Sequence, residues 1–154
     1  MIIRKATLKD FEELKKLWAE FFLLEASTDE RVNTEWVKQG LPVALGKSLR
    51  NKNEATFVAE EKGKLVGYAS SEIIPNSRRI RYEKQGHLYN LYVIPRYRGK
   101  NIGKRLLEKS LDWFKKRKVK DLKIMAYEWN KRAQKLYRKY GFRDYMLMMM
   151  KISK

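Results

Sequence analysis

The segment from Val93 to Leu107 carries the residues whose types and spacing point most clearly to chemistry. An apolar run passes into a helical pattern through a small basic turn that contains Gly99 and Gly103. The first N–H groups of a helix have no partner within it, and the helix dipole favours anions at that end. Glycine lets a ligand approach the backbone closely. The turn is therefore predicted to bind phosphate groups, with cationic side chains from Arg98, Lys100, Lys104 and Arg105.

Two common nucleotide-binding motifs do not fit this turn. A Walker A loop has four residues between its glycines and then Lys and Ser or Thr, whereas Gly99 and Gly103 enclose three residues and Lys104 is followed by Arg105. The dinucleotide pattern GxGxxG is also absent from the sequence. The nucleotide-hydrolase and nicotinamide interpretations are therefore weakened. An ordinary basic turn with a glycine cap stays open as the plainer interpretation.

Composition limits the other catalytic chemistries. The chain has no Cys, which excludes disulfides, thiolate zinc sites and a cysteine nucleophile. It has a single His, His87, so a metal site built from several His is excluded as well. No apolar run approaches the roughly 20 residues of a membrane-spanning helix, and the first residues become charged too early for a secretory signal. We therefore expect a cytoplasmic protein with no metal and no membrane segment.

The hydrophobic patterns predict the elements that must position the turn. Strands are expected near residues 2–6, 55–60, 65–74, 87–93 and 122–127, with a last strand or hairpin over 145–152. Helices are expected after a capping box at Thr7–Asp10, as one or two short helices within 25–53, after Ile102, and from Asn130 to Gly141. This order predicts an α/β (α+β) fold with a mixed sheet flanked by helices, in a single domain over residues 1–154.

The last strand is expected to place the run Met146–Met150 in the core. A subunit contact through that strand stays open, so the sequence allows a monomer or a homodimer.

The charge of the chain allows a second class of function. Lys and Arg total 36 against 18 Asp and Glu, a net charge of +18, while 44% of the residues are hydrophobic. So much apolar material excludes a disordered basic tail and predicts a core beneath a positive surface. Such a surface attracts nucleic acid, cofactor phosphates or anionic lipid. A basic nucleic-acid-associated module stays open as the alternative, although the chain has no helix-turn-helix, zinc-finger or RNP signature.

The basic turn resembles the acetyl-CoA loop of GNAT-type N-acetyltransferases, whose motif is Arg/Gln-x-x-Gly-x-Gly/Ala. Arg98 matches the first position and Gly103 the last, whereas Asn101 stands where the middle glycine is usual. Asn tolerates left-handed backbone better than most residues, so the loop is still expected to form. The segment from Asn130 to Phe142 resembles the family's Asn-x-x-Ala-x-x-Leu-Tyr-x-x-x-Gly-Phe pattern. The resemblance covers essentially the whole chain.

This resemblance implies a mostly antiparallel sheet that is splayed near the cofactor site. It implies direct transfer of an acetyl group from acetyl-CoA to a primary amine of a protein or a small molecule, in a ternary complex. Tyr137 is implied as the general acid that protonates the leaving thiolate. The implied cofactor-binding residues are Leu91, Tyr92, Val93, Arg98, Gly99, Lys100, Asn101, Ile102, Gly103, Lys104, Asn130 and Tyr137.

The general base is located by counting along the chain. Some protein-lysine acetyltransferases of this superfamily place a Glu near the start of the strand that leads to the loop, and counting back from Val93 puts His87 there. Imidazole exchanges protons near neutral pH, which suits a general base. A His that only caps the strand start or lies on the surface is the alternative, with Glu83 and Glu72 as reserve bases.

Two further questions stay open at this level. An acyl-CoA-sensing module without catalysis is a third interpretation, because Asn101 departs from the loop motif. The acceptor is expected to be selected by residues 25–53 and by the basic loop over 75–86. A cationic acceptor would need acidic groups in the cleft, such as Glu25, Asp29, Glu30 or Glu35.

Overall fold

The computed structural model describes residues 1–152 and divides the chain into two compact units, which meet between Lys123 and Ile124. The first contains β1 (Ile2–Lys5), the 3-10 helix η1 (Leu8–Asp10), α1 (Phe11–Ala26), α2 (Thr34–Arg50), β2 (Glu54–Glu61), β3 (Lys64–Pro75), β4 (Lys84–Val93), the 3-10 helix η2 (Pro95–Tyr97), α3 (Ile102–Lys116) and most of β5 (Asp121–Ile124). The second contains α4 (Lys131–Lys139).

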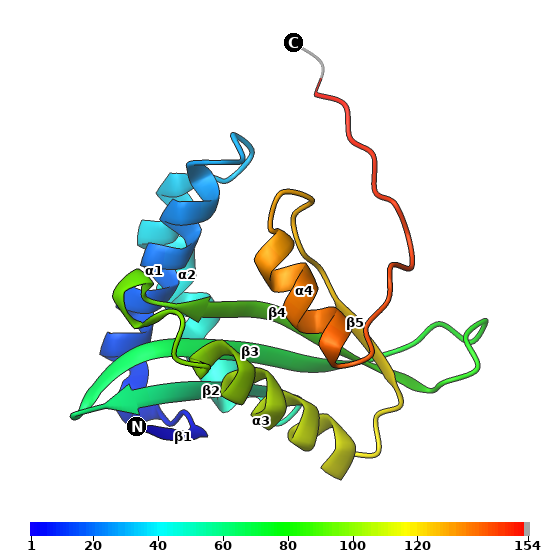
Figure 1. Ribbon diagram of the computed structural model, residues 1–154, viewed down its shortest axis with the longest axis horizontal. Helices are drawn as coiled ribbons and strands as arrows, with labels where there is room; N and C mark the ends of the chain where they lie inside the picture. Colours follow the sequence, from blue (N-terminus) through cyan, green and yellow to red (C-terminus); the bar gives the residue numbers. More distant parts are fainter. Residues whose placement is uncertain (153–154) are drawn as a thin grey trace. The chain divides into compact units, whose positions relative to one another are not determined.

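The strands form one sheet in the order β1-β2-β3-β4-β5 (Figure 1). The pairs β1–β2, β2–β3 and β3–β4 are antiparallel, and their register aligns Val58 with Tyr68 and Tyr68 with Tyr92. This confirms the predicted fold class, a mostly antiparallel sheet flanked by helices. The expectation of one domain over residues 1–154 stays a prediction.

The two faces of the sheet carry different helices. Val58, Tyr68 and Tyr92 belong to the core cluster formed with α1 and α2, which also contains Leu14, Leu17, Trp18, Leu41 and Leu45. Successive strand residues point to opposite faces. Val93 follows Tyr92, and its Cγ2 lies 3.9 Å from the position of a Cβ built on Gly103, at the start of α3. Helix α3 therefore covers the face opposite to α1 and α2.

Helix α2 covers most of residues 25–53, where the sequence predicts one or two short helices. It is a single helix, although Pro42 lies inside it and cannot donate a backbone hydrogen bond. Leu41 and Leu45 are completely buried on either side of Pro42. Their burial in the core compensates for the missing hydrogen bond, and propensity alone could not reveal this.

The expected last strand over residues 145–152 is wrong. Residues 142–152 have no regular secondary structure, and the side chains of Met146 to Met150 are 60–83% exposed. A run that is apolar at every position needs cover on both faces of a strand. The second unit contains one helix within the described residues, which is too little to supply that cover. Strand β5 also ends at Ile124, earlier than expected.

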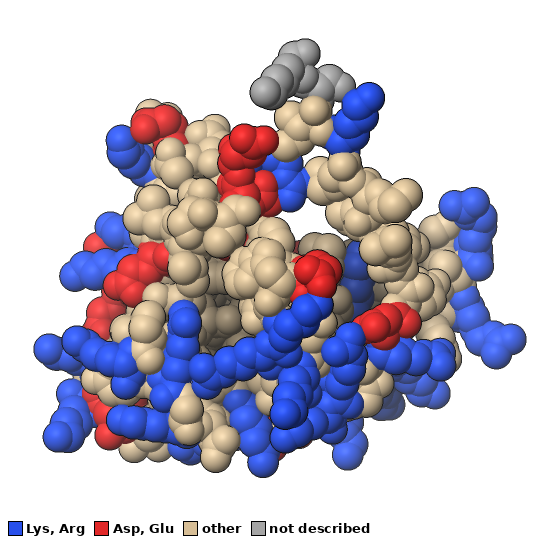
Figure 2. Space-filling view, turned by 45° about the horizontal axis from the view of Figure 1, so that its top comes forward, with Lys and Arg blue, Asp and Glu red and all other residues tan. Residues whose placement is uncertain are grey.

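Lys and Arg dominate the surface of the chain. Figure 2 shows these side chains spread over the face that it draws, with Asp and Glu in smaller groups between them. No helix within residues 1–152 is both long and apolar enough to cross a membrane.

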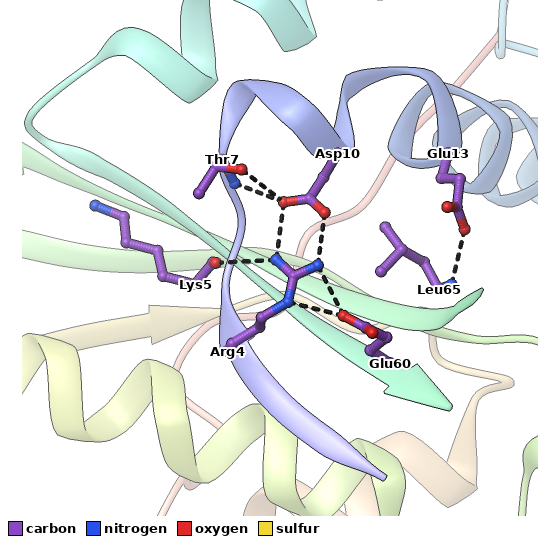
Figure 3. A network of polar contacts seen from close by, with 7 residues as sticks. All are labelled: Arg4, Lys5, Thr7, Asp10, Glu13, Glu60 and Leu65. Atoms are coloured by element: carbon purple, nitrogen blue, oxygen red, sulfur yellow. Dashed lines mark hydrogen bonds and ion pairs between the residues drawn. The ribbon is translucent and has the colours of Figure 1, made fainter. Parts of the chain in front are cut away.

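A polar network fixes β1 to the start of α1 (Figure 3). The Arg4 guanidinium donates two hydrogen bonds to the Asp10 carboxylate, at 2.9 and 2.7 Å, and a third to Glu60 at 2.9 Å. Asp10 also accepts from the Thr7 backbone N–H at 2.7 Å, which confirms the predicted capping box. The hydrogen bonds from Arg4 are the largest cause that lowers the pKa of Asp10, to about 2.

Candidate functional site

The basic turn between β4 and α3 adopts the shape expected of an anion-binding loop. Gly99 and Asn101 have φ values of 86° and 59°, so both are left-handed. Asn101 thus takes the conformation usually given to the motif's glycine, as its tolerance for this region predicts. The Arg105 N–H donates to the Asn101 carbonyl at 3.1 Å. The N–H groups of residues 102–104 precede this bond, so a ligand at the helix start can accept from them.

The cationic side chains of the turn surround this helix start in two different ways. Arg98 donates from Nε to the Val93 carbonyl at 2.9 Å, and its guanidinium lies 5.8 Å from the Tyr92 ring centre. It therefore braces the end of β4 as well as supplying charge. Lys100 and Lys104 are exposed, and the Lys104 ammonium lies 3.9 Å from Glu108. A Cβ built on Gly99 meets no atom within 4 Å, so space for a ligand remains beside the turn.

At the end of β4, one edge of the backbone is not paired with another strand of the first unit. Leu91, Tyr92 and Val93 pair with β3 through Ala69, Tyr68 and Gly67. On the other side, the Asp121 carboxylate at the start of β5 accepts from Gln85 Nε2 at 3.0 Å. A four-residue strand spans only about 13 Å, so β5 does not extend as far as Leu91. The backbone of residues 91–93 is therefore not paired with β5, and its Val93 carbonyl accepts from Arg98.

Strand β4 also carries a row of side chains that contact carboxylates. His87 Nδ1 lies 3.3 Å from Glu72 Oε1. The Tyr89 hydroxyl donates to Glu54 at 3.2 Å, and the Tyr92 hydroxyl donates to Glu20 at 3.2 Å. Tyr92 and Glu20 lie on the face of the sheet that carries α1 and α2, and burial raises the pKa of both tyrosines. These phenols stay protonated and serve as donors to the carboxylates.

His87 lies inside β4, which begins at Lys84, so the alternative that it caps the strand start is wrong. The Nε2 atom of His87 is buried and has no hydrogen-bond partner among residues 1–152. A carboxylate at Nδ1 favours the tautomer with the proton on Nδ1, which leaves the Nε2 lone pair as an acceptor. About 13 Å of strand separates His87 from Leu91, so the ring does not touch the end of β4 directly.

The two reserve bases differ in their surroundings. Glu72 contacts His87, as described above, and so supports that residue. Glu83 is exposed and precedes the first residue of β4, at the far end of the strand from Val93. The structure therefore brings Glu72 to the His87 site and does not bring Glu83 there.

Asn130 and Tyr137 belong to the second unit. The Asn130 side chain accepts a hydrogen bond from the Ala133 N–H at 3.1 Å, which confirms that it caps α4. Tyr137 is buried, with its ring 6.3 Å from that of Phe142. Burial raises the pKa of Tyr137 to about 12, so the phenol keeps its proton at neutral pH. Their contacts with a cofactor stay predictions.

Sequence reasoning missed Glu54, Tyr89 and Glu20. Tyr89 is two positions from His87, so the strand period was a signal that the two side chains share an orientation. No local signal connects either residue to Glu54, because that contact depends on the register that aligns Glu54 with Glu72 across β2 and β3.

Known proteins resemble this chain in sequence and in fold. Residues 11–142 match the acetyltransferase (GNAT) family. YhfO of Bacillus subtilis, an uncharacterized N-acetyltransferase, is 26% identical over 146 residues, which cover 94% of this chain and 91% of YhfO.

Two solved structures share the fold over nearly their whole length. A predicted acetyltransferase of Clostridium acetobutylicum, crystallised with acetyl-CoA, is 22% identical, with a TM-score of 0.79 over 98% of this chain and 95% of that one. A ribosomal-protein-alanine N-acetyltransferase of Brucella melitensis is 21% identical, with a TM-score of 0.70 over 99% of this chain and 100% of that one. The family match over residues 11–142 shows that the chain belongs to the acetyltransferase (GNAT) family, and the two solved structures share its fold.

Proposed function

We propose that this chain transfers the acetyl group of acetyl-CoA directly to a primary amine, with His87 as the general base and Tyr137 as the general acid. One observation carries the proposal. His87 presents Nδ1 to the Glu72 carboxylate at 3.3 Å and keeps Nε2 buried without a partner among the described residues. A ring held in this way is poised to accept a proton at Nε2.

The cofactor would lie along the end of β4 and the basic turn. The backbone of Leu91, Tyr92 and Val93 would pair with the pantetheine arm, and an N–H of this segment would polarise the thioester carbonyl. The N–H groups of Gly99 to Lys104, with the cationic side chains of the turn, would bind the diphosphate. Asn130 would add a contact from α4.

The chemical steps follow from these placements. The acceptor ammonium gives a proton to His87 Nε2 through a chain of waters, because about 13 Å of strand separates His87 from Leu91. The neutral amine attacks the thioester carbonyl and forms a C–N bond. The attacking nitrogen loses its second proton to water, the tetrahedral intermediate collapses with cleavage of the C–S bond, and the departing thiolate takes the phenolic proton of Tyr137, which water then restores. The charge of Glu72 stabilises the imidazolium that forms on His87.

The carboxylate row along β4 favours a positively charged acceptor. Glu20, Glu54 and Glu72 each contact a β4 side chain, so negative charge lies beside the proposed route of the proton. Opposite charge steers an ammonium group toward such a surface, even on a chain whose net charge is +18. The solved relative of Brucella melitensis is a ribosomal-protein-alanine N-acetyltransferase by name, and its acceptor is therefore an amine on a protein. A protein amino group or a small amine fits the same chemistry here.

The test of the base compares His87→Gln and Glu72→Gln with the matched control Glu83→Gln, across a panel of amines and peptides. His87→Gln is expected to lower kcat/KM at neutral pH by about 10²–10⁴-fold, the usual contribution of general base catalysis. The deficit should narrow as pH rises and the free amine becomes abundant. Glu72→Gln should lose less and should move the pH–rate profile.

Calorimetry separates catalysis from cofactor binding in the same variants. Acetyl-CoA affinity should stay unchanged in all three, because none of these residues lies on the turn or the end of β4. An unaltered pH–rate profile in His87→Gln would remove it as the base. Acetyl-CoA binding without thiol release from any acceptor would support an acyl-CoA sensor instead.

The acid has its own test. Tyr137→Phe removes only the hydroxyl, so the ring packing against Phe142 is kept. We expect kcat to fall by about 10²-fold while acetyl-CoA affinity is retained, because the thiolate then leaves without a proton donor. Turnover equal to that of the parent protein would show that another group or water supplies this proton.

A further inference from the structure

Nearly half of the net positive charge lies in two short segments. Residues 76–84 join β3 to β4, and residues 115–123 run from the end of α3 into β5. We call them together the basic hairpin surface. They contain two acidic residues, Glu83 and Asp121, against ten basic ones, a net of +8 out of the chain's +18. The basic residues are Arg78, Arg79, Arg81, Lys84, Lys115, Lys116, Arg117, Lys118, Lys120 and Lys123.

Three hydrogen bonds hold the two segments side by side. Lys84 Nζ donates to the Arg117 carbonyl at 2.7 Å. Asn76 Nδ2 and Gln85 Nε2 both donate to the Asp121 carboxylate at 3.0 Å. The two basic segments therefore lie next to each other.

The positive charge of this surface is not balanced within the protein. None of the ten basic side chains is in an ion pair within residues 1–152. All are exposed except Lys84, which is half-buried. Of the two carboxylates in these segments, that of Asp121 is already bound to two amides. Like charges so close together repel one another, and a polyanion that binds them relieves this repulsion.

The surface is separate from the cofactor turn. Residue 84 begins β4 and residue 93 ends it, so about 30 Å of strand separates the two. The charges of the basic hairpin surface are thus additional to those proposed to bind a diphosphate at the turn.

The side chains on the hairpin favour nucleic acid over other polyanions. Ile80 and Tyr82 are 48% and 45% exposed and alternate with Arg79 and Arg81. Exposed aromatic rings beside a cationic track are the means by which proteins bind single strands, since bases stack on the rings while phosphates contact the cations. Guanidinium groups also bind phosphate in a bidentate manner and stack on bases. We propose that the basic hairpin surface binds single-stranded RNA, with a base stacked on Tyr82.

The test measures fluorescence anisotropy of a labelled 20-nucleotide single-stranded RNA with the full chain, over a range of salt concentrations. The test variant is Arg78→Gln/Arg79→Gln/Arg81→Gln. The matched control, Lys16→Gln/Lys47→Gln/Lys52→Gln, removes the same charge from exposed positions elsewhere. The test variant should bind RNA more than tenfold more weakly, and its salt slope should fall by about 2, since each phosphate contact contributes about 0.7 for single strands. The control should lose less than about threefold.

Two further measurements distinguish RNA from other anions and from misfolding. Tyr82→Ala should weaken RNA binding about tenfold, which corresponds to one stacked base, and should leave polyphosphate binding unchanged. Acetyl-CoA affinity should be equal in all variants, and no variant should melt at a lower temperature than the parent protein. Equal losses in the test and control variants, or no RNA binding at low salt, would overturn the proposal. Stronger binding to phosphatidylserine vesicles than to RNA would assign the surface to a membrane instead.

Discussion

At the residue scale, three side chains of β4 contact carboxylates, and they differ in whether they can accept a proton. Two are tyrosines and one is a histidine. Tyr89 and Tyr92 keep their protons because burial raises their pKa, and so each can only donate to its carboxylate. His87 differs because its second nitrogen stays free of partners among the described residues. Of the three side chains, only the histidine can therefore accept a proton from a substrate.

Asp10 gives a prediction of pH dependence at the same scale. Its pKa is lowered from 3.8 to about 2, so the folded state favours the carboxylate more than the unfolded chain does. The resulting stability is fully present above about pH 4 and is lost as pH falls toward 2. Asp10→Asn should lower the free energy of unfolding at pH 7 and flatten its decline between pH 4 and 2. Urea denaturation across this range measures both effects.

Glu12→Gln is the control for Asp10→Asn. Glu12 is an exposed acid two residues along the chain, and its ion pair with Lys15 contributes little in solvent. Glu12→Gln should show the same decline in the free energy of unfolding between pH 4 and 2 as the parent protein. If the free energy of unfolding of Asp10→Asn declined as steeply between pH 4 and 2 as that of the parent, other carboxylates would control the loss of stability.

At the element scale, two glycines show which part of β4 must not move. A Cβ built on Gly67 would lie 2.7 Å from the Tyr92 carbonyl oxygen, a backbone atom at the end of β4. A Cβ built on Gly86 would lie 2.7 Å from Phe114 and Leu122 side chains instead. The first contact displaces the backbone proposed to bind pantetheine, whereas the second overpacks the contact with α3.

The pair Gly67→Ala and Gly86→Ala tests this difference. Both should lose about 1–3 kcal/mol of stability in chemical denaturation, the typical cost of overpacking. Only Gly67→Ala should also weaken acetyl-CoA binding in calorimetry, by tenfold or more. Equal acetyl-CoA affinities in the two variants would contradict the placement of the cofactor on the end of β4.

At the scale of the whole molecule, the net charge of +18 sets up repulsion that the fold must overcome. At 0.1 M, salt largely screens the repulsion between exposed charges that lie more than about 10 Å apart. Raising NaCl from 50 to 500 mM should therefore raise the melting temperature, by about 2–4 °C for each kcal/mol of repulsion relieved. Calorimetric scans measure the shift. The arginine-to-glutamine variant of the basic hairpin surface should respond less, and a melting temperature that fell with salt would show that favourable ion pairs dominate.

The sequence by itself determined the local elements and the backbone conformation of the basic turn between β4 and α3. The capping box at Thr7–Asp10 lies where it was predicted, and Asn101 takes the left-handed backbone that its side chain tolerates. Both depend on residues within a few positions of one another, so local chemistry is enough to predict them. The apolar spacing after Ile102 predicted α3 for the same reason.

Only the tertiary structure decided the contacts between distant segments. The pairing of His87 with Glu72, and of Tyr89 with Glu54, depends on strand register, which a shift of one residue would abolish. The continuity of α2 through Pro42 depends on the burial of Leu41 and Leu45 in the core. The failure of the strand expected over residues 145–152 has the same origin, because β-propensity forms a strand only where a neighbouring strand and a covering layer exist.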